Sequence, residues 1–265
     1  MAQQVLIRPR VSSLRARCPD CRTFTAVAVG SGYECHSCGR TFAAGLVRVP
    51  RAWGSGGQEM AEGARIQLPY PEVAVVERAT LEEQIGAVAQ ALAERPVVVG
   101  GCCCSHVGAA RGLADRFERL AVVWIDSHGD LNTPETSPSG NQWGMPFRMI
   151  LDSGAVTAED AALVGARNLD PPESEFMAAA GLDDSLERAL AGVDAAYVAL
   201  DLDVLDPSEV DVLIPEPDGP SPDELEAVVR DIAARTTIAG MGVTGFLPTE
   251  RNAALAAQML AAAGF

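Results

Sequence analysis

The sequence contains no lysine, so all 20 of its basic residues are arginine. It also lacks any run of about 18 apolar residues, the length that a membrane-spanning helix needs. The first ten residues, MAQQVLIRPR, hold no apolar core of the kind found in a secretory signal peptide. We therefore expect a cytoplasmic protein with no membrane partner.

Negative charge predominates, with 36 acidic residues against 20 arginines and a net charge of −16. The first 51 residues run against this trend, because they hold eight arginines against only Asp20 and Glu34. An acidic body repels a phosphate backbone, and the basic segment has no aromatic platform on which bases could stack. We therefore do not expect nucleic acid as a partner, although the basic segment leaves a small contact of that kind open.

Size and composition indicate a folded chain. With 265 residues, 48% of them hydrophobic, the protein can bury about 70–75% of the surface that its unfolded chain exposes. One large domain, or one domain with a small module, is the organisation that this length favours.

The seven cysteines form two groups. Cys18-Pro-Asp-Cys21 and Cys35-His-Ser-Cys38 are two Cys-x-x-Cys pairs flanking a predicted β-hairpin, a pattern typical of a zinc ribbon. We predict a ribbon over residues 1–43 in which all four cysteines bind one structural zinc ion and His36 takes no part. The second group, Cys102, Cys103 and Cys104, is contiguous, and neighbouring cysteines are poor disulfide partners.

From about residue 46 the pattern alternates between apolar strands and helices. The predicted strands cover 46–49, 73–76, 97–99, 120–125, 162–164, 196–200 and 237–238, and the clearest predicted helices cover 81–94, 106–118 and 222–235. Near-continuous apolar strands in repeated βα units predict a parallel sheet that is covered on both faces. In such α/β sheets, ligands bind at the carboxyl ends of the strands.

Clusters of polar side chains follow three of these strands. They are Gly100-Gly-Cys-Cys-Cys-Ser-His106, Asp126-Ser-His128-Gly-Asp130 and Asp201-Leu-Asp203. Carboxylates and an imidazole that project together are costly to bury without a cation. Because carboxylates can bridge two ions, the sequence predicts a centre of two divalent metals: Mn²⁺, with Zn²⁺, Fe²⁺ or Co²⁺ as alternatives.

At these motifs the sequence resembles the ureohydrolase superfamily, the arginases and agmatinases. Asp126-Ser-His-Gly-Asp130 is similar to the family's Asp-Ala-His-x-Asp, and Asp201-Leu-Asp203-Val-Leu-Asp206-Pro207 to its Asp-x-Asp-x-x-Asp-Pro. The segment from Asn132 to Asn141 resembles the arginase substrate loop, and Arg167-Asn-Leu-Asp170-Pro-Pro-Glu173 resembles Arg-Asp-x-Asp-Pro-x-Glu. The resemblance implies a three-layer α/β/α sandwich over residues 44–265, a small-molecule substrate and a homo-oligomer.

The resemblance also implies roles for individual residues. Asp126 and Asp201 would bridge two Mn²⁺ ions, Asp130 would bind one ion, and His128 and Asp203 would bind the other. Asp126, Asp130 and Asp201 would thus be the catalytic residues, activating a water that attacks a guanidinium carbon. Asn132, Ser139, Asn141 and Asp170 would hold the amino-acid end of the substrate.

Three positions depart from the family pattern. The family's usual ligand His of Gly-Gly-Asp-His corresponds to Cys103, with His106 one helical turn further on, and either side chain could complete the metal site. The family's proton-shuttling His corresponds to Trp143, which cannot transfer a proton and could instead line an apolar pocket or stack on a planar or cationic substrate. The family's guanidinium-pairing Glu corresponds to Gly245, and Glu250 or Glu216 could take over its role.

These departures favour a metallohydrolase that cleaves a C–N bond of a guanidino, amidino or related amino-acid-like substrate other than L-arginine. The alternative is a catalytically inactive protein with the arginase fold that binds a ligand or partner and docks through its zinc ribbon.

Overall fold

The computed structural model describes residues 15–16, 18, 21, 23, 25–29, 32–42 and 45–265. The basic residues before position 15 and the predicted domain boundary between residues 43 and 44 lie outside this range.

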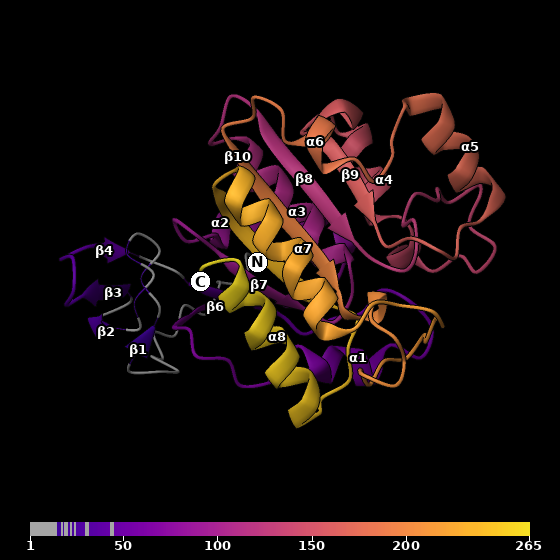
Figure 1. Cartoon of the computed structure of the whole chain (residues 1–265). Coiled ribbons are helices and arrows are strands. Elements are labelled where there is room, and N and C mark those ends of the chain that lie inside the picture. Colours follow the sequence, from indigo (N-terminus) through magenta and orange to yellow (C-terminus); the bar gives the residue numbers. More distant parts are fainter. Residues whose placement is uncertain are drawn as a thin grey trace.

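The body is built on a seven-stranded sheet with the strand order β6-β5-β7-β11-β10-β8-β9 (Figure 1). Every neighbouring pair in it is parallel. The strands are β5 (Leu46–Val49), β6 (Glu72–Val75), β7 (Val97–Gly100), β8 (Leu120–Ile125), β9 (Ala161–Val164), β10 (Ala195–Asp201) and β11 (Ile238–Thr244). All carboxyl ends therefore meet at one edge, with β10 and β11 at the centre.

Helices cover both faces of this sheet. They are α1 (Gln58–Gly63), α2 (Leu81–Ala91), α3 (Cys104–Ala114), α4 (Pro146–Asp152), α5 (Pro171–Ala180), α6 (Leu186–Ala189), α7 (Pro222–Arg235) and α8 (Glu250–Ala262), with short 3₁₀ turns η1 (Gln142–Gly144), η2 (Ala158–Asp160) and η3 (Leu202–Val204). Helices α2, α3 and α4 share one apolar core with the sheet, and α7 and α8 share the other. The predicted α/β/α sandwich with a parallel sheet is confirmed. Within the described part of the chain, no helix is both long and apolar enough to cross a membrane.

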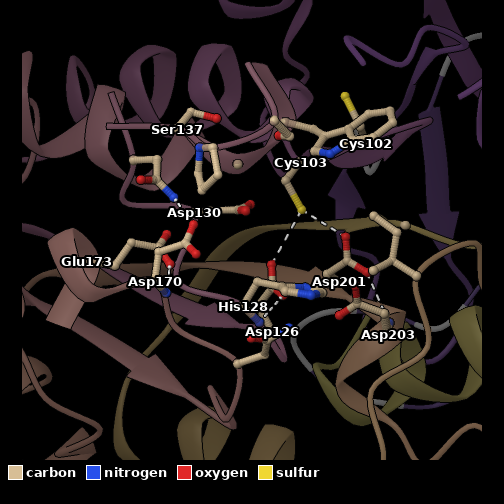
Figure 2. A pocket seen from close by; sticks show the side chains of 18 of the residues that line it. Cys102, Cys103, Asp126, His128, Asp130, Ser137, Asp170, Glu173, Asp201 and Asp203 are labelled. Atoms are coloured by element: carbon tan, nitrogen blue, oxygen red, sulfur yellow. Dashed lines mark hydrogen bonds and ion pairs between the residues drawn. The ribbon is translucent and has the colours of Figure 1, made fainter. Parts of the chain in front are cut away.

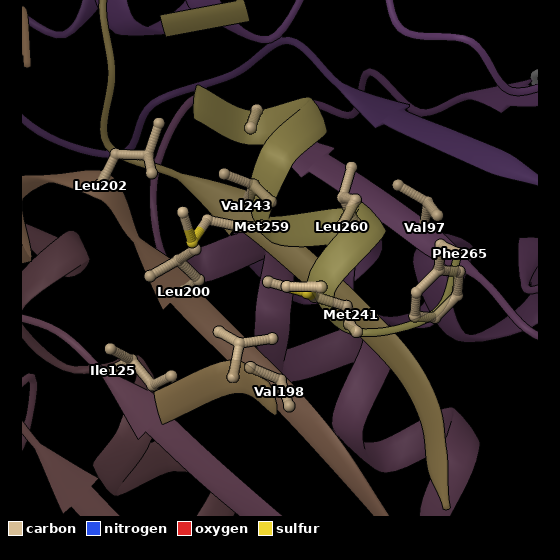
Figure 3. Close-up of a cluster of buried hydrophobic side chains, with 14 of the residues drawn as sticks. Val97, Ile125, Val198, Leu200, Leu202, Met241, Val243, Met259, Leu260 and Phe265 are labelled. Atoms are coloured by element: carbon tan, nitrogen blue, oxygen red, sulfur yellow. The ribbon is translucent and has the colours of Figure 1, made fainter. Parts of the chain in front are cut away.

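The alternation of side chains along β10 explains both cores. Ala196, Val198 and Leu200 face α7 and α8, whereas Tyr197 and its alternate neighbours face α2 and α3. Figure 3 shows the first of these cores, in which Val198 and Leu200 lie among side chains of β8, β11 and α8. Burying both faces requires apolar residues at successive positions, which is why these strands are continuous apolar runs in the sequence.

The predicted helix starting after Ser221 is confirmed together with its cap. Ser221 Oγ accepts a hydrogen bond from Glu224 N, and Glu224 Oε2 accepts one from Ser221 N at 2.8 Å. The strand predicted at 237–238 was too short, because β11 continues to Thr244. Gly240 and Gly242 weaken the apolar pattern there, but Gly242 is needed: a Cβ at this position would overlap the ring of His106 and the hydroxyl of Tyr197.

A separate four-stranded antiparallel sheet precedes the body and lies to one side of it (Figure 1). Its strands are β1 (Arg15–Ala16), β2 (Ala26–Val29), β3 (Gly32–Cys35) and β4 (Thr41–Phe42). Its small core contains Tyr33 stacked on Phe42. The four sulfur atoms of Cys18, Cys21, Cys35 and Cys38 lie within 4.8 Å of one another, an arrangement compatible with a ribbon module.

Candidate metal centre and substrate pocket

The ends of three central strands bring the polar clusters together. Cys103 lies in the turn between β7 and α3, Asp126 directly follows β8, and Asp201 is the last residue of β10. Because β7, β11, β10 and β8 are adjacent and parallel, these three side chains converge above the carboxyl edge of the sheet. Figure 2 shows the sulfur of Cys103 pointing toward the carboxylates of Asp126 and Asp201.

Two groups of potential ligand atoms share Asp126. The first is Cys103, Asp126 and Asp201, and Cys103 Sγ lies 2.9 Å from Asp201 Oδ2 and 3.7 Å from Asp126 Oδ2. The second is Asp126, His128 and Asp203, and His128 Nδ1 lies 3.4 Å from Asp126 Oδ1 and 3.2 Å from Asp203 Oδ2. A carboxylate common to two groups is the arrangement that bridges a pair of ions.

Asp130 lines the same cavity, although it belongs to neither group of potential ligand atoms. Its Oδ2 is buried and has no hydrogen-bond partner among the described residues. Its backbone has φ 52°, in the left-handed region that residues other than glycine rarely adopt. An unpaired buried carboxylate oxygen held by a strained backbone is aimed at a ligand that supplies positive charge.

The four carboxylates are buried together, with exposed fractions of 2% for Asp126, 6% for Asp130 and Asp201, and 7% for Asp203. Burial, reinforced by the neighbouring negative charges, raises the pKa of Asp201 to about 7 and that of Asp203 to about 6. Burial and the neighbouring carboxylates also raise the pKa of Asp130 well above its usual value. Divalent cations remove this penalty, so the donor set fits a metal centre.

Burial and the nearby carboxylates also raise the pKa of the Cys103 thiol well above its usual value. In this structure the thiol donates a hydrogen bond to Asp201 Oδ2. A bound metal ion displaces a thiol proton, so the sulfur would join the ligands as a thiolate.

Three further side chains orient the ligands and were not anticipated from the sequence. Trp124 Nε1 donates to Asp126 Oδ2 at 3.2 Å, Ser127 Oγ donates to Asp203 Oδ1 at 2.7 Å, and Thr244 Oγ1 donates to Asp201 Oδ2 at 3.2 Å. The sequence could have indicated the role of Trp124, because Trp124 and Asp126 are two residues apart and residues at this spacing on a strand share a face. Supporting hydrogen bonds of this kind fix ligand geometry.

His106, the alternative to Cys103 as a ligand, lies outside both groups. Its Nδ1 is 2.8 Å from Tyr197 Oη and its Nε2 is 3.1 Å from Thr244 Oγ1. Complete burial lowers the pKa of His106 to about 3, so the ring is neutral. His106 lies outside the ligand groups because it is on α3, where β10 and β11 cover it. Cys103 instead precedes the helix and faces the strand ends.

A cavity of about 170 Å³ opens above the cluster. Of the residues predicted to bind substrate, Asn132, Ser139, Trp143 and Asp170 line it. Asn141 is not among the lining residues, because its Oδ1 accepts a hydrogen bond from Ser55 N at 3.0 Å and so holds a neighbouring loop. Ser137, Met60 and Ile214 line the cavity and were not anticipated.

Glu216 lies beside His128 and is not among the residues that line the cavity. Its Oε1 accepts a hydrogen bond from Asn168 Nδ2 at 2.7 Å and lies 3.5 Å from His128 Nε2. A carboxylate on the second ring nitrogen of a ligand histidine fixes the tautomer that leaves Nδ1 free to bind metal.

Comparison with known proteins agrees with this geometry. The family model described as "Arginase family" matches residues 58–264. The arginase of Bacillus caldovelox is 32% identical, over a match that covers 49% of this chain and 54% of that protein. The chain thus spans about half the length of the curated relatives that it matches.

Solved structures share the fold. Arginase of Entamoeba histolytica in complex with L-ornithine has a TM-score of 0.71 at 19% identity, covering 83% of this chain and 97% of that one. Formimidoylglutamase of Bacillus subtilis has a TM-score of 0.67 at 19% identity, covering 83% and 86%. With a family model matched over most of its length and this fold beneath a cluster of buried carboxylates, the chain belongs to the arginase family.

Proposed function

We propose that this protein is a binuclear metallohydrolase that cleaves a C–N bond at a planar carbon of a guanidino, amidino or related amino-acid-like substrate other than L-arginine. The observation that carries the proposal is the shared carboxylate of Asp126 between two groups of ligand atoms. The unpaired Oδ2 of Asp130 supports it, because this buried oxygen has no protein partner within the described chain.

The ligands divide into two sets. Asp126 and Asp201 would bridge the ions, Cys103 and Asp130 would complete one site, and His128 and Asp203 the other. When bound, such ions supply Lewis acidity and lower the pKa of neighbouring water. Carboxylates and imidazole suit Mn²⁺, whereas the sulfur of Cys103 favours Zn²⁺, Fe²⁺ or Co²⁺ at its site.

The remaining residues position and enclose the substrate. Asn132, Ser139 and Asp170 offer hydrogen bonds on one side of the cavity, and Trp143 forms an apolar wall. Indole cannot donate or accept a catalytic proton, so Trp143 contributes surface and excludes water. The guanidinium carboxylate and the proton-shuttling imidazole expected for L-arginine hydrolysis are both replaced in this chain, by Gly245 and Trp143.

We also propose that residues 1–43 form a zinc ribbon and residues 44–265 the hydrolase domain. Cys18 Sγ lies 3.6 Å from Cys38 Sγ, and Cys21 Sγ lies 3.5 Å from Cys35 Sγ. Four sulfurs at about 2.3 Å from a tetrahedral zinc ion lie about 3.8 Å apart, close to this spacing. The family resemblance further leads us to propose a cytoplasmic homo-oligomer with a small-molecule substrate and no nucleic-acid or membrane partner.

The test is metal content per chain, measured on protein purified without added metal and again after loading with Mn²⁺. We expect one zinc in the ribbon and two further ions in the body. Asp126→Ala and Asp203→Ala should each lose the two body ions. Each variant should also lose the activity that releases urea or ammonia from guanidino, amidino and amide compounds. The matched control is Asp184→Ala, which removes an exposed carboxylate that does not line the cavity.

Two outcomes would contradict the hydrolase. Turnover that survives Asp126→Ala would show that the cluster is not the catalytic centre. Full loading with tight ligand binding but no turnover would favour the inactive binding protein, the alternative that Trp143 supports because it removes an acid–base group.

A further inference from the structure

The substrate pocket differs from one built for a cation, and the difference begins at the end of β11. Gly245 directly follows this strand with φ 78°, and a Cβ there would overlap the carboxylate of Asp201. No side chain, and so no carboxylate, can be accommodated at this position without moving the cluster. The gap left by the missing acidic residue is thus built into the backbone.

No other described acidic residue takes its place. The acidic residues that line the cavity are Asp126, Asp130, Asp170, Glu173, Asp201 and Asp203. Four of them would bind the proposed ions, and together with the Cys103 thiolate they carry five negative charges against the four positive charges of two divalent ions. A carboxylate occupied in this way is not available to form a two-point pair with a guanidinium.

The two that are left, Asp170 and Glu173, are already hydrogen-bonded within the protein. Glu173 Oε1 accepts from Leu131 N and its Oε2 accepts from Asp170 N, both at 2.9 Å. Asp170 Oδ2 accepts from Asn132 Nδ2 at 2.8 Å. Figure 2 shows both residues on the side of Asp130, across the cluster from Asp201. Glu216 is bonded to Asn168 and is not among the lining residues.

The rest of the wall is apolar or uncharged. Trp143 packs against Gly54 and Gly57, where any Cβ would overlap or crowd the indole, so the ring is held in one place. Met60, Cys102 and Ile214 extend this surface, and the polar groups around it include the amides of Asn132 and Asn168 and the hydroxyls of Ser137 and Ser139. Amides and hydroxyls offer both donors and acceptors to an uncharged polar group.

We propose that the scissile group of the substrate is an uncharged planar amide or ureido group rather than a guanidinium or amidinium cation. This inference rests on the proposed hydrolase function and, of the substrate classes named there, sets aside the guanidino and amidino compounds and keeps only the related uncharged ones. A buried cation without a carboxylate partner is costly, and its attraction to the ring of Trp143 does not replace a paired carboxylate. An uncharged carbonyl carries no such penalty.

The reaction balances with water as the only co-reactant. The hydroxyl of water bonds to the carbonyl carbon, the C–N bond breaks, and the nitrogen leaves with the second proton of water. An amide gives a carboxylic acid and an amine or ammonia. A ureido group gives an amine and carbamic acid, which decomposes to carbon dioxide and ammonia.

The test compares isosteric pairs on the full metal-loaded chain. L-citrulline carries a ureido group where L-arginine carries a guanidinium. Benzamide carries an amide where benzamidine carries an amidinium. We expect the uncharged member to bind at least about tenfold more tightly by calorimetry, because its partner buries an unpaired charge. We also expect ammonia release from uncharged members only.

Ile214→Glu tests whether a carboxylate added to the cavity wall changes the preference between uncharged and cationic substrates. Ile214 is half-buried on the cavity wall, so a longer polar side chain can be accommodated there. The new carboxylate should reverse the preference within each pair, and the uncharged control Ile214→Gln should not.

The results separate this inference from the function on which it rests. Tighter binding or faster hydrolysis of the cationic members by the parent protein overturns the uncharged substrate and leaves the hydrolase intact. Binding of uncharged members without any turnover overturns the hydrolase and leaves the specificity intact. Equal binding within each pair, or binding of neither member, also overturns the inference.

Discussion

Cys103 is the residue that most distinguishes this metal centre chemically. Its sulfur lies 2.9 Å from a carboxylate oxygen of Asp201 and 3.1 Å from Thr244 Oγ1, and the side chain is buried. A thiolate is a softer ligand than imidazole or carboxylate, so the two ion sites of one centre would have different preferences. The site that contains Cys103 should retain Zn²⁺ or Co²⁺ more strongly than Mn²⁺.

Cys103→Ser should remove this preference. We expect cobalt-loaded parent protein to show a near-ultraviolet sulfur-to-cobalt band that is weaker in the variant, and we expect zinc affinity at the body to fall by at least about tenfold. The cysteines of the proposed ribbon contribute equally to the spectra of the parent protein and of the variant. The difference between the two spectra therefore reports the contribution of Cys103 alone.

Cys102→Ser is the control for Cys103→Ser. Cys102 is equally buried and lines the same cavity, but it belongs to neither group of ligand atoms. Its replacement should leave the cobalt band and zinc affinity unchanged. An unchanged band in Cys103→Ser, or an equal loss in both variants, would show that the sulfur of Cys103 does not bind the metal.

At the scale of elements, the close packing of α2 on α3 depends on glycine. A Cβ on Gly108 of α3 would lie 2.5 Å from the carbonyl oxygen of Ile85 and 2.8 Å from Val88 Cβ. Gly108→Ala should therefore lower the free energy of unfolding by about 1–3 kcal/mol through overpacking. Urea denaturation of metal-loaded protein measures this change.

Gly86 provides the opposite case on α2. It is exposed, and a Cβ there meets no atom within 4 Å. Gly86→Ala should raise the free energy of unfolding by about 0.5–1 kcal/mol, because alanine loses less backbone freedom in a helix. If Gly108→Ala and Gly86→Ala changed the free energy of unfolding by similar amounts in the same direction, the packing explanation would be wrong.

The sequence predicts the elements of the sheet best where burial on both faces demands continuous apolar residues, as in β8 and β10. It underestimates β11, because the glycine that makes room for His106 and Tyr197 breaks the apolar pattern. It also cannot choose between Cys103 and His106, since one helical turn separates them and only the start of α3 decides which faces the cluster. The place of Asn141 is set by a contact with Ser55, 86 residues away, which local pattern cannot indicate.

At the scale of the whole molecule, the N-terminal sheet and the body have separate apolar cores. Two contacts that join them are a hydrogen bond from Tyr33 Oη to the carbonyl oxygen of Pro69 and an ion pair between Arg40 and Glu94. The ion pair is largely exposed and so contributes little stability. We therefore expect the fold of the body, with its proposed metal centre, not to depend on the proposed ribbon.

Cys35→Ser tests this independence. Cys35 is a buried member of the group of four sulfurs, and a core as small as that of the proposed ribbon needs bound zinc to stay folded. We expect the variant to lose one zinc ion per chain by elemental analysis while the two body ions and the far-ultraviolet signal of the α/β domain are kept. His36→Ala should retain all three ions, because His36 lies outside the sulfur cluster. Retention of the ribbon zinc in Cys35→Ser would refute the ribbon, whereas loss of the body ions would show that the two modules fold as one unit.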